Sequence, residues 1–364
     1  MSFCDQAVSG VANLKPYIPG MPVEELQRKY GVRNIVKLAS NENPLGPPKA
    51  AIAAVALAAK EMARYPDGNG FSLKTALATK HQIAAEQITL GNGSNDILEI
   101  VARTFAEKGD EIIFSEHAFA IYGLVTQAIG ATPIVTPAVN YGHDLTAMLK
   151  AITAKTKIIY IANPNNPTGT WLDPEDIKLF LEKVPEKVIV VLDEAYVEYL
   201  HTEENSIPWL QHFQNLIITR TFSKAFGLAG LRVGYSVSDP EVADLMNRVR
   251  QPFNVSHLAL TAAVAALGDE AYLQQTREVN EAGMKQLIAG FEKMGLQYIP
   301  SKANFITVNV HTNALEVYDE LLYEGVIVRP VANYGLPQHL RVSIGLAEEN
   351  QQFLDALSGI LGRG

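Results

Sequence analysis

The chain has 364 residues, of which 48% are hydrophobic and 19% charged, so we expect about two domains with buried cores and not a disordered chain. Its formal net charge of -9, without clusters of Lys and Arg, argues against a nucleic-acid surface and favours small molecules as partners. The single cysteine, Cys4, cannot form an intrachain disulfide, which fits a reducing cytoplasm. The first residues lack a signal-peptide pattern, and the longest apolar run, residues 50–59, is too short to span a membrane.

The N-terminal third begins with irregular sequence and continues with helical patterns. Residues 1–30 contain Pro16, Pro19 and Pro22 and predict an irregular arm. The apolar run at 50–59 predicts a helix, and residues 94–105 place Ile97, Ile100, Val101 and Phe105 on one helical face.

Near-continuous apolar runs then alternate with helical stretches. The runs are "EIIFSE", "TKIIYIAN", "KVIVVLDE", "NLIITRT" and "LRVGYSV". Strands that are apolar on both faces belong to a mostly parallel sheet covered by helices. After about residue 255 the pattern changes to long helices followed by the short strands in "ANFITVNV", "GVIVRP" and "HLRVSIG". We therefore predict an α/β fold with an arm at 1–30, a large domain at 46–255, and a smaller α+β domain formed by 31–45 and 256–364.

Polar residues follow three of the predicted strands. They are Asn166 after "IIYIA", Asp193 and Tyr196 in "VIVVLDEAY", and Thr221, Ser223 and Lys224 in "LIITRTFSK". Ligands bind beyond the carboxyl ends of strands in open parallel sheets, so all three groups are predicted to face one crevice. Singly, each has a commoner explanation, because an aspartate after a strand is usually a helix cap and a lone lysine is usually solvated. Their coincidence at three strand ends favours a binding site.

The chemistry of this group fits pyridoxal phosphate. Asp193 would keep a pyridine nitrogen protonated, and Lys224 would bind the cofactor through its amine and then move the proton of the amino carbon. For the phosphate, the sequence offers the hydroxyls of Thr221 and Ser223 and the guanidinium of Arg232. It also offers a glycine turn followed by a helix N-terminus at Ser94 and Asn95.

Other ligand motifs do not match. The runs "GNGSND" and "DGNGFS" lack the third glycine of a dinucleotide fingerprint, and no glycine loop ends in Gly-Lys-Ser/Thr. The histidines show no HExxH spacing, so no metal is expected.

The ordered segments "NPNNPTG", "DEAY" and "SKAFGLAGLRVGY" resemble those of the fold-type I pyridoxal-phosphate aminotransferases. Over nearly the whole chain, "LKPYIPG", "KLASNENPLGP", "RYPDGNG", "LGNGSNDIL" and "LRVSIG" are similar to the histidinol-phosphate aminotransferases. The resemblance implies a large domain with a mostly parallel seven-stranded sheet between helices, and a smaller α+β domain.

For the cofactor site, the resemblance implies that Asn166 and Tyr196 hydrogen-bond the phenolic oxygen of the cofactor. It implies that Phe119 stacks on the pyridine ring, although such enzymes usually have tyrosine within Pro-Thr-Tyr where this chain has "HAF". Tyr65 in "RYPDG" resembles the tyrosine that reaches the cofactor phosphate of the neighbouring subunit, which implies a homodimer with shared active sites.

For the substrates, the resemblance implies that Arg341 holds the α-carboxylate of the amino donor, and that Arg329 and Tyr17 hold the phosphate of the substrate. Asn43 is expected at the same mouth, or else as an ordinary turn residue. The implied reaction is transamination between L-histidinol phosphate and 2-oxoglutarate. Alternatives are an aromatic amino-acid aminotransferase, a phosphothreonine-type decarboxylase and a non-catalytic pyridoxal-phosphate-binding protein.

Overall fold

The computed structural model describes residues 3–16, 20–200 and 205–362. Its main sheet has seven strands, in the spatial order β2 (Ile88–Gly91), β10 (Gly234–Ser238), β9 (Leu216–Thr221), β8 (Ile189–Asp193), β7 (Thr156–Ala162), β3 (Glu111–Ser115) and β4 (Thr132–Thr136). The five strands from β9 to β4 are parallel, whereas β10 runs antiparallel to both β9 and β2. The predicted mostly parallel, seven-stranded sheet is therefore confirmed.

Helices cover both faces of this sheet, because alternate strand residues feed two separate apolar cores. One core includes side chains of α4 (Phe71–His81), α7 (Leu145–Lys150), α8 (Pro174–Leu181) and α10 (His257–Leu267). The other includes side chains of α5 (Ser94–Phe105), α6 (Ala120–Ala128) and α9 (Pro240–Val249). We call the main sheet with these helices and α3 (Lys49–Ala58) the large domain. A short hairpin, β5 (Ala138–Val139) and β6 (Gly142–His143), extends from it.

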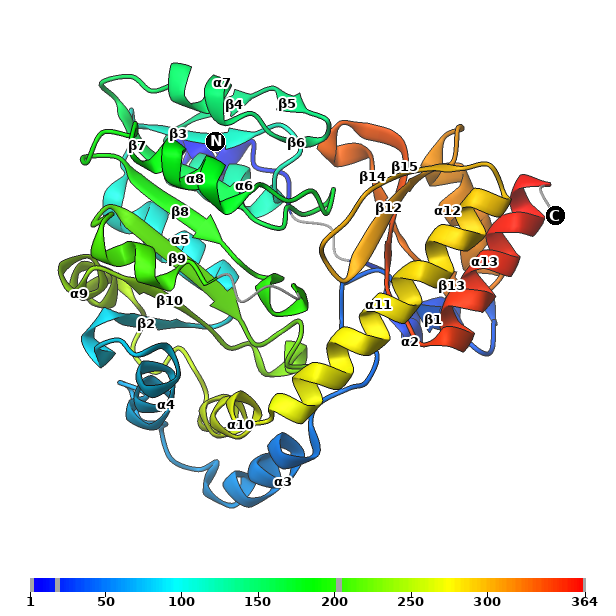
Figure 1. Cartoon of the computed structure of the whole chain (residues 1–364), viewed down its shortest axis with the longest axis horizontal. Coiled ribbons are helices and arrows are strands. Elements are labelled where there is room, and N and C mark those ends of the chain that lie inside the picture. The colour runs from blue at the N-terminus through cyan, green and yellow to red at the C-terminus, as the bar shows by residue number, and fades with distance from the viewer. Residues whose placement is uncertain (1–2, 17–19, 201–204, 363–364) are drawn as a thin grey trace.

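The small domain is built on a four-stranded antiparallel sheet. Its order is β11 (Gln297–Ile299), β12 (Phe305–Asn309), β15 (Leu336–Ser343) and β14 (Arg329–Val331). A parallel pair, β1 (Val36–Lys37) and β13 (Val326–Ile327), lies beside it, together with α12 (Ala314–Tyr323) and α13 (Ala347–Leu361). The long helix α11 (Glu270–Lys293) extends from the large domain to the small one (Figure 1). Leu273 packs in the core of the large domain and Leu287 in that of the small domain.

Three elements depart from the predicted organisation: α10 in its domain, and α1 and α2 in the arm. Residues 256–267 were expected in the small domain, yet Ala259 and Leu260 of α10 share the core of the large domain with Leu73 and Leu77. The alanine-rich face of α10 allows this close approach to α3 and α4. In the predicted irregular arm, the structure instead contains α1 (Ser9–Ala12) and α2 (Val23–Tyr30).

The helix α2 forms because it has an apolar side to bury. Leu26 is fully buried against Leu322 and Ile327 of the small domain. Gly31 ends the helix in the left-handed conformation, with φ 68°. Tertiary packing thus overrides the signal of the nearby prolines. Within the described residues, no helix is long and apolar enough to cross a membrane.

Candidate active site

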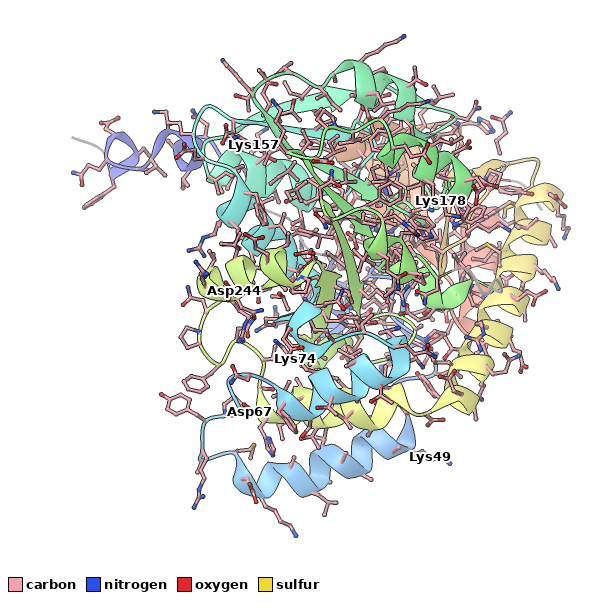
Figure 2. All side chains as sticks on the ribbon, turned by 60° about the vertical axis from the view of Figure 1, so that its left-hand side comes forward. Lys49, Asp67, Lys74, Lys157, Lys178 and Asp244 are labelled. Carbon is pink, nitrogen blue, oxygen red and sulfur yellow. The ribbon has the colours of Figure 1, made fainter. Side chains whose placement is uncertain are left out.

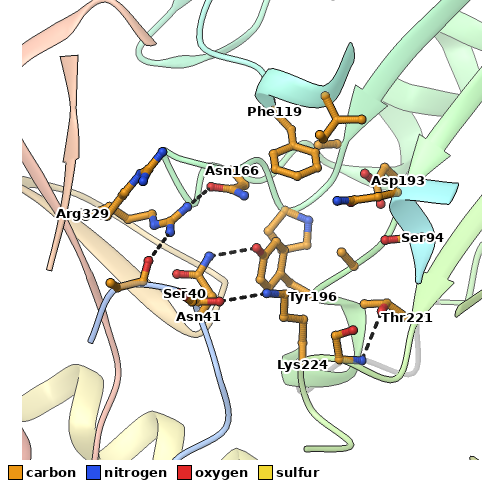
Figure 3. A pocket seen from close by; sticks show the side chains of 18 of the residues that line it. Ser40, Asn41, Ser94, Phe119, Asn166, Asp193, Tyr196, Thr221, Lys224 and Arg329 are labelled. Atoms are coloured by element: carbon orange, nitrogen blue, oxygen red, sulfur yellow. Dashed lines mark hydrogen bonds between the residues drawn. The ribbon is translucent and has the colours of Figure 1, made fainter. Parts of the chain in front are cut away.

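A cavity of about 270 Å³ lies at the carboxyl ends of β7, β8 and β9 and extends to the small domain. Most residues predicted for the site line it: Ser94, Asn95, Phe119, Asn166, Asp193, Tyr196, Thr221, Ser223, Lys224, Arg232, Arg329 and Arg341. Figure 3 shows Asp193 and Thr221 on the large-domain side of the cavity and Arg329 opposite them, on the small-domain side. The cavity therefore contains anion-binding, acidic and amine groups within one enclosure.

Asp193 is placed by the end of β8 and is held by two hydroxyl groups. Its Oδ2 accepts a hydrogen bond from Tyr122 Oη at 2.8 Å, and its Oδ1 accepts one from Thr219 Oγ1 at 3.0 Å. Burial raises the pKa of Asp193 above its ordinary value, and these two hydrogen bonds act in the opposite direction. The carboxylate is thus kept from solvent and oriented by its neighbours.

Lys224 follows β9, and its buried environment favours the neutral form of its amine. Nζ donates a hydrogen bond to the carbonyl oxygen of Ser40 at 3.0 Å (Figure 3). Burial lowers the pKa of Lys224 to about 7, and the positive charge of Arg341 adds to the effect. A neutral amine can act as a nucleophile or a base, so this environment suits covalent and proton-transfer chemistry.

The turn before α5 forms an anion cradle. Gly93 is the N-cap of α5 with φ 78°, and no side chain caps the first turn, so the helix presents its amide groups toward the cavity at Ser94. Arg232 lies over this turn and donates from Nη1 to Ser223 Oγ at 3.1 Å. A Cβ atom at Gly93 would be 2.5 Å from Arg232 Nη2, so glycine is required for this close packing. The hydroxyl, amide and guanidinium donors fit a phosphate monoester.

The side of the cavity near the small domain is a hydrogen-bonded network. Arg341 donates from Nη1 to Asn166 Oδ1 and from Nη2 to the carbonyl oxygen of Ala39 at 2.7 Å. Tyr196 accepts a hydrogen bond from Asn41 Nδ2 at 2.9 Å. Burial raises the pKa of Tyr196 to about 12, and the charge of Arg341 opposes this. The Tyr196 hydroxyl therefore stays protonated and can donate a hydrogen bond into the cavity.

Of the predicted residues that the structure describes, Asn43 and Tyr65 do not line the cavity. Asn43 lies outside it: its amide donates to Ala225 O, Tyr272 Oη and Thr276 Oγ1, and its Oδ1 accepts from the Leu45 amide. With its hydrogen bonds used inside the protein, Asn43 fastens the turn, and the expectation that it lies at the mouth is corrected. Tyr65 is 83% exposed and stacks on Phe253, with ring centroids 4.8 Å apart. Tyr17 lies outside the described residues.

The sequence analysis missed Ser40 and Asn41, which line the cavity, and Tyr122, which hydrogen-bonds Asp193. Asn41 stands in the same "SNEN" segment as Asn43, two residues earlier, and a left-handed backbone with φ 54° turns it into the cavity. Nothing local distinguishes the two asparagines. The ring of Tyr122 packs in the core, as a tyrosine in an apolar helical stretch usually does, so the sequence does not mark its hydroxyl as part of the site. Within the described residues, no group of three or more His, Cys, Asp or Glu side chains could hold a metal ion.

Comparisons with known proteins agree with this geometry. The family model for class I and II aminotransferases matches residues 33–357. The chain is 57% identical to histidinol-phosphate aminotransferase 2 of Pseudomonas fluorescens (strain Pf0-1), over 100% of this chain and 99% of the relative. It is 56% identical to histidinol-phosphate aminotransferase 1 of Idiomarina loihiensis, over 97% of both chains.

Solved structures show the same fold. The histidinol-phosphate aminotransferase of Sinorhizobium meliloti in complex with pyridoxal 5'-phosphate superposes with a TM-score of 0.89, at 29% identity over 95% of both chains. The enzyme of Clostridium acetobutylicum gives a TM-score of 0.84 at 26% identity, over 90% of this chain and 99% of that one. The chain thus has the fold-type I aminotransferase architecture, and it belongs to the class I and II aminotransferases and, within them, to the histidinol-phosphate aminotransferase family.

Proposed function

We propose that the protein transfers an amino group between L-histidinol phosphate and 2-oxoglutarate, giving imidazole-acetol phosphate and L-glutamate, with pyridoxal 5'-phosphate as cofactor. In histidine biosynthesis the reaction would run in reverse. The observation that carries the proposal is that one cavity contains the Lys224 amine, whose pKa is lowered to about 7, the buried carboxylate of Asp193, and a phosphate cradle at Gly93 and Arg232. The relatives' names supply the substrate.

Bound pyridoxal phosphate supplies an electron sink for the bond that breaks at the amino carbon. The protein's part is to hold it. Ser94 and Asn95 at the helix N-terminus, with Ser223 and Arg232, would bind the phosphate, and Thr221 lines the cavity beside them.

The other cofactor contacts come from the large domain. Asp193 would meet the ring nitrogen, and Asn166 and Tyr196 would hold the phenolic oxygen. The ring of Phe119 would cover one ring face; phenylalanine can stack as tyrosine does but offers no hydroxyl. Lys224 would bind the cofactor through Nζ and move a proton at the amino carbon, for which its lowered pKa of about 7 is suited.

Substrate recognition falls to two arginines. Arg341 would hold the carboxylate of glutamate, because a guanidinium fork matches a planar carboxylate. Arg329, on the small-domain side of the cavity, would hold the phosphate of histidinol phosphate, together with Tyr17. Separate arginines let one site accept a dicarboxylate in one half-reaction and a phosphate monoester in the other.

The test is substrate choice. We expect kcat/KM for histidinol phosphate to exceed those for phenylalanine and tyrosine. Arg329→Ala should lower it by at least about tenfold, because a charge-assisted hydrogen bond contributes roughly 1.5 to 3 kcal/mol and 1.36 kcal/mol corresponds to about tenfold. Tyr17→Phe should lower it less, since only a neutral hydroxyl is lost.

Phenylalanine, which lacks a phosphate, is the matched control for Arg329→Ala. Single-turnover measurements should show that Arg341→Ala damages the glutamate half-reaction more than Arg329→Ala does. If Arg329→Ala left histidinol-phosphate turnover unchanged and the unaltered protein preferred phenylalanine or tyrosine, the aromatic aminotransferase assignment would replace this one.

We further propose a homodimer with shared sites, supported by exposed apolar side chains around α3 and α4. Figure 2 shows Asp67 at the periphery of the molecule, below Lys74 of α4, and Tyr65 precedes it in the loop between α3 and α4. The exposed set is Ile52, Leu57, Met62, Tyr65, Phe71 and Phe253. Burying such a group against a second copy would remove apolar surface from water. A cytoplasmic location stays a prediction from the single cysteine.

A further inference from the structure

Both oxygens of Asp193 receive a hydroxyl donor, and the two donors come from different elements. Tyr122, on α6, donates to Oδ2 at 2.8 Å, and Thr219, on β9, donates to Oδ1 at 3.0 Å. Asp193 is only 4% exposed, so water contributes little to its hydration. The two hydroxyl groups therefore stand in for the solvent that an ionised carboxylate loses on burial.

The ring of Tyr122 is held so that its hydroxyl has one position. It is fully buried and stacks on Tyr160, with ring centroids 4.6 Å apart and planes at 2°. Tyr160 is in turn held by a hydrogen bond from its Oη to the carbonyl oxygen of Leu98 at 2.9 Å. The rings of Tyr122 and Phe119 make an edge contact, with ring centroids 6.0 Å apart. The hydroxyl of Tyr122 is thus aimed by packing.

Packing alone does not require a hydroxyl at this position. The surrounding core consists of apolar side chains, and phenylalanine would fill the same volume. A buried hydroxyl costs free energy unless it is hydrogen-bonded, and here its partner is a residue of the site. The hydroxyl at position 122 is therefore best explained by its effect on Asp193.

We propose that Tyr122 is a positioning residue that, together with Thr219, forms a hydroxyl clamp which keeps Asp193 ionised and aims it at the ring nitrogen of the cofactor. The inference rests on the pyridoxal-phosphate function proposed above. Tyr122 acts only through Asp193: without its hydroxyl, the buried carboxylate would keep only the Thr219 hydroxyl and the Ala195 backbone amide as donors, and it would pair less well with a protonated ring nitrogen.

The test is the affinity of the cofactor-free protein for pyridoxamine 5'-phosphate and for its 1-deaza analogue, in which CH replaces the ring nitrogen. Pyridoxamine phosphate forms no bond to Lys224, so calorimetric dissociation constants report contacts alone. The unaltered protein should prefer pyridoxamine phosphate. Tyr122→Phe should reduce this preference by about tenfold, equivalent to about 1.4 kcal/mol, through weaker binding of pyridoxamine phosphate and not of the analogue.

The neighbouring tyrosine offers a matched control. Tyr160→Phe removes a hydroxyl from the same stack but one that bonds to Leu98, so it should leave the preference unchanged. The inference is overturned if Tyr122→Phe keeps the full preference, or if Tyr160→Phe loses as much. If Tyr122→Phe did not fold, Thr219→Val would decide in the same assay, since an unchanged preference there contradicts the clamp. Failure of the unaltered protein to bind either compound would instead contradict the proposed function.

Discussion

Lys224 illustrates how burial sets the chemistry of a single residue. The ordinary pKa of lysine is near 10.5, and burial with the nearby charge of Arg341 lowers it to about 7. Between pH 7 and 10.5 the folded protein therefore holds this amine mostly neutral, whereas the unfolded chain would hold it charged. Folding releases that proton, so this group destabilises the folded state fully below about pH 7, and the penalty falls as the pH rises toward 10.5.

The residue-scale prediction concerns the reactivity of this amine in the cofactor-free protein. Brief labelling with an amine-reactive reagent, read by peptide mass spectrometry, should rise with pH to a plateau above about pH 8, with a midpoint near 7. A solvated lysine amine gains reactivity up to about pH 10, so the other lysine peptides serve as internal references. Labelling of Lys224 that kept rising to pH 10 would contradict the lowered pKa.

At the scale of elements, the site depends on how strands and helices end. Asp193 closes β8, Lys224 follows β9, and Ser94 opens α5, so three chain reversals meet at one edge of the sheet. The turn at Gly93 is a close contact, because its φ is positive and Arg232 lies directly over it. A phosphate cradle of backbone amides needs this close approach.

We therefore expect Gly93→Ala to weaken pyridoxal-phosphate binding by at least about tenfold, since the added Cβ would displace Arg232, 2.5 Å away, in addition to straining the backbone. Gly109→Ala is the matched control: Gly109 has φ 100° but nothing within 4 Å of an added Cβ. It should lose about 1 to 2 kcal/mol of stability while keeping affinity. Equal affinity losses in both variants would show that strain alone, and not the cradle, is responsible.

At the scale of the whole molecule, the domains and the proposed dimer complete the site. The small domain contributes Arg329 and Arg341 to a cavity whose other groups come from the large domain. Tyr65 lies outside this cavity, is 83% exposed and stacks on Phe253. Tyr65 thus does not line the cavity of its own chain, and its exposed ring is available for the contact with a neighbouring subunit proposed above.

Subunit mixing tests this placement. Tyr65→Ala and Lys224→Ala, each inactive alone, should recover partial activity when mixed and refolded, because one of the two sites in the hybrid dimer would carry neither change. Lys224→Ala mixed with Arg232→Ala is the control and should recover none, since both residues line the cavity of their own chain. Absence of recovery in the first mixture, with subunit exchange demonstrated, would remove Tyr65 from the neighbour's site.

Much of the architecture follows from local sequence. The apolar runs of β3, β7, β8, β9 and β10 identified strands buried on both faces, and the polar residues after them identified the cavity. Both signals are local. The periodicity of apolar side chains reports which faces of a strand are buried, and in a parallel sheet the carboxyl ends of all strands lie at the same edge. Asp193 and Lys224 can therefore be assigned to one site from the sequence, because each lies at the carboxyl end of a strand in the same parallel sheet.

Contacts between distant segments were decided by the tertiary structure. The hydroxyl of Tyr122 reaches Asp193 across 71 residues of sequence, and no local pattern distinguishes it from a core tyrosine. Likewise, Asn41 rather than Asn43 faces the cavity because of a backbone turn and bonds to distant residues. The helix α10 joins the large domain because its alanines fit against α3 and α4. Periodicity specifies which side of an element is buried, but the partner that buries it is selected only when the whole chain packs.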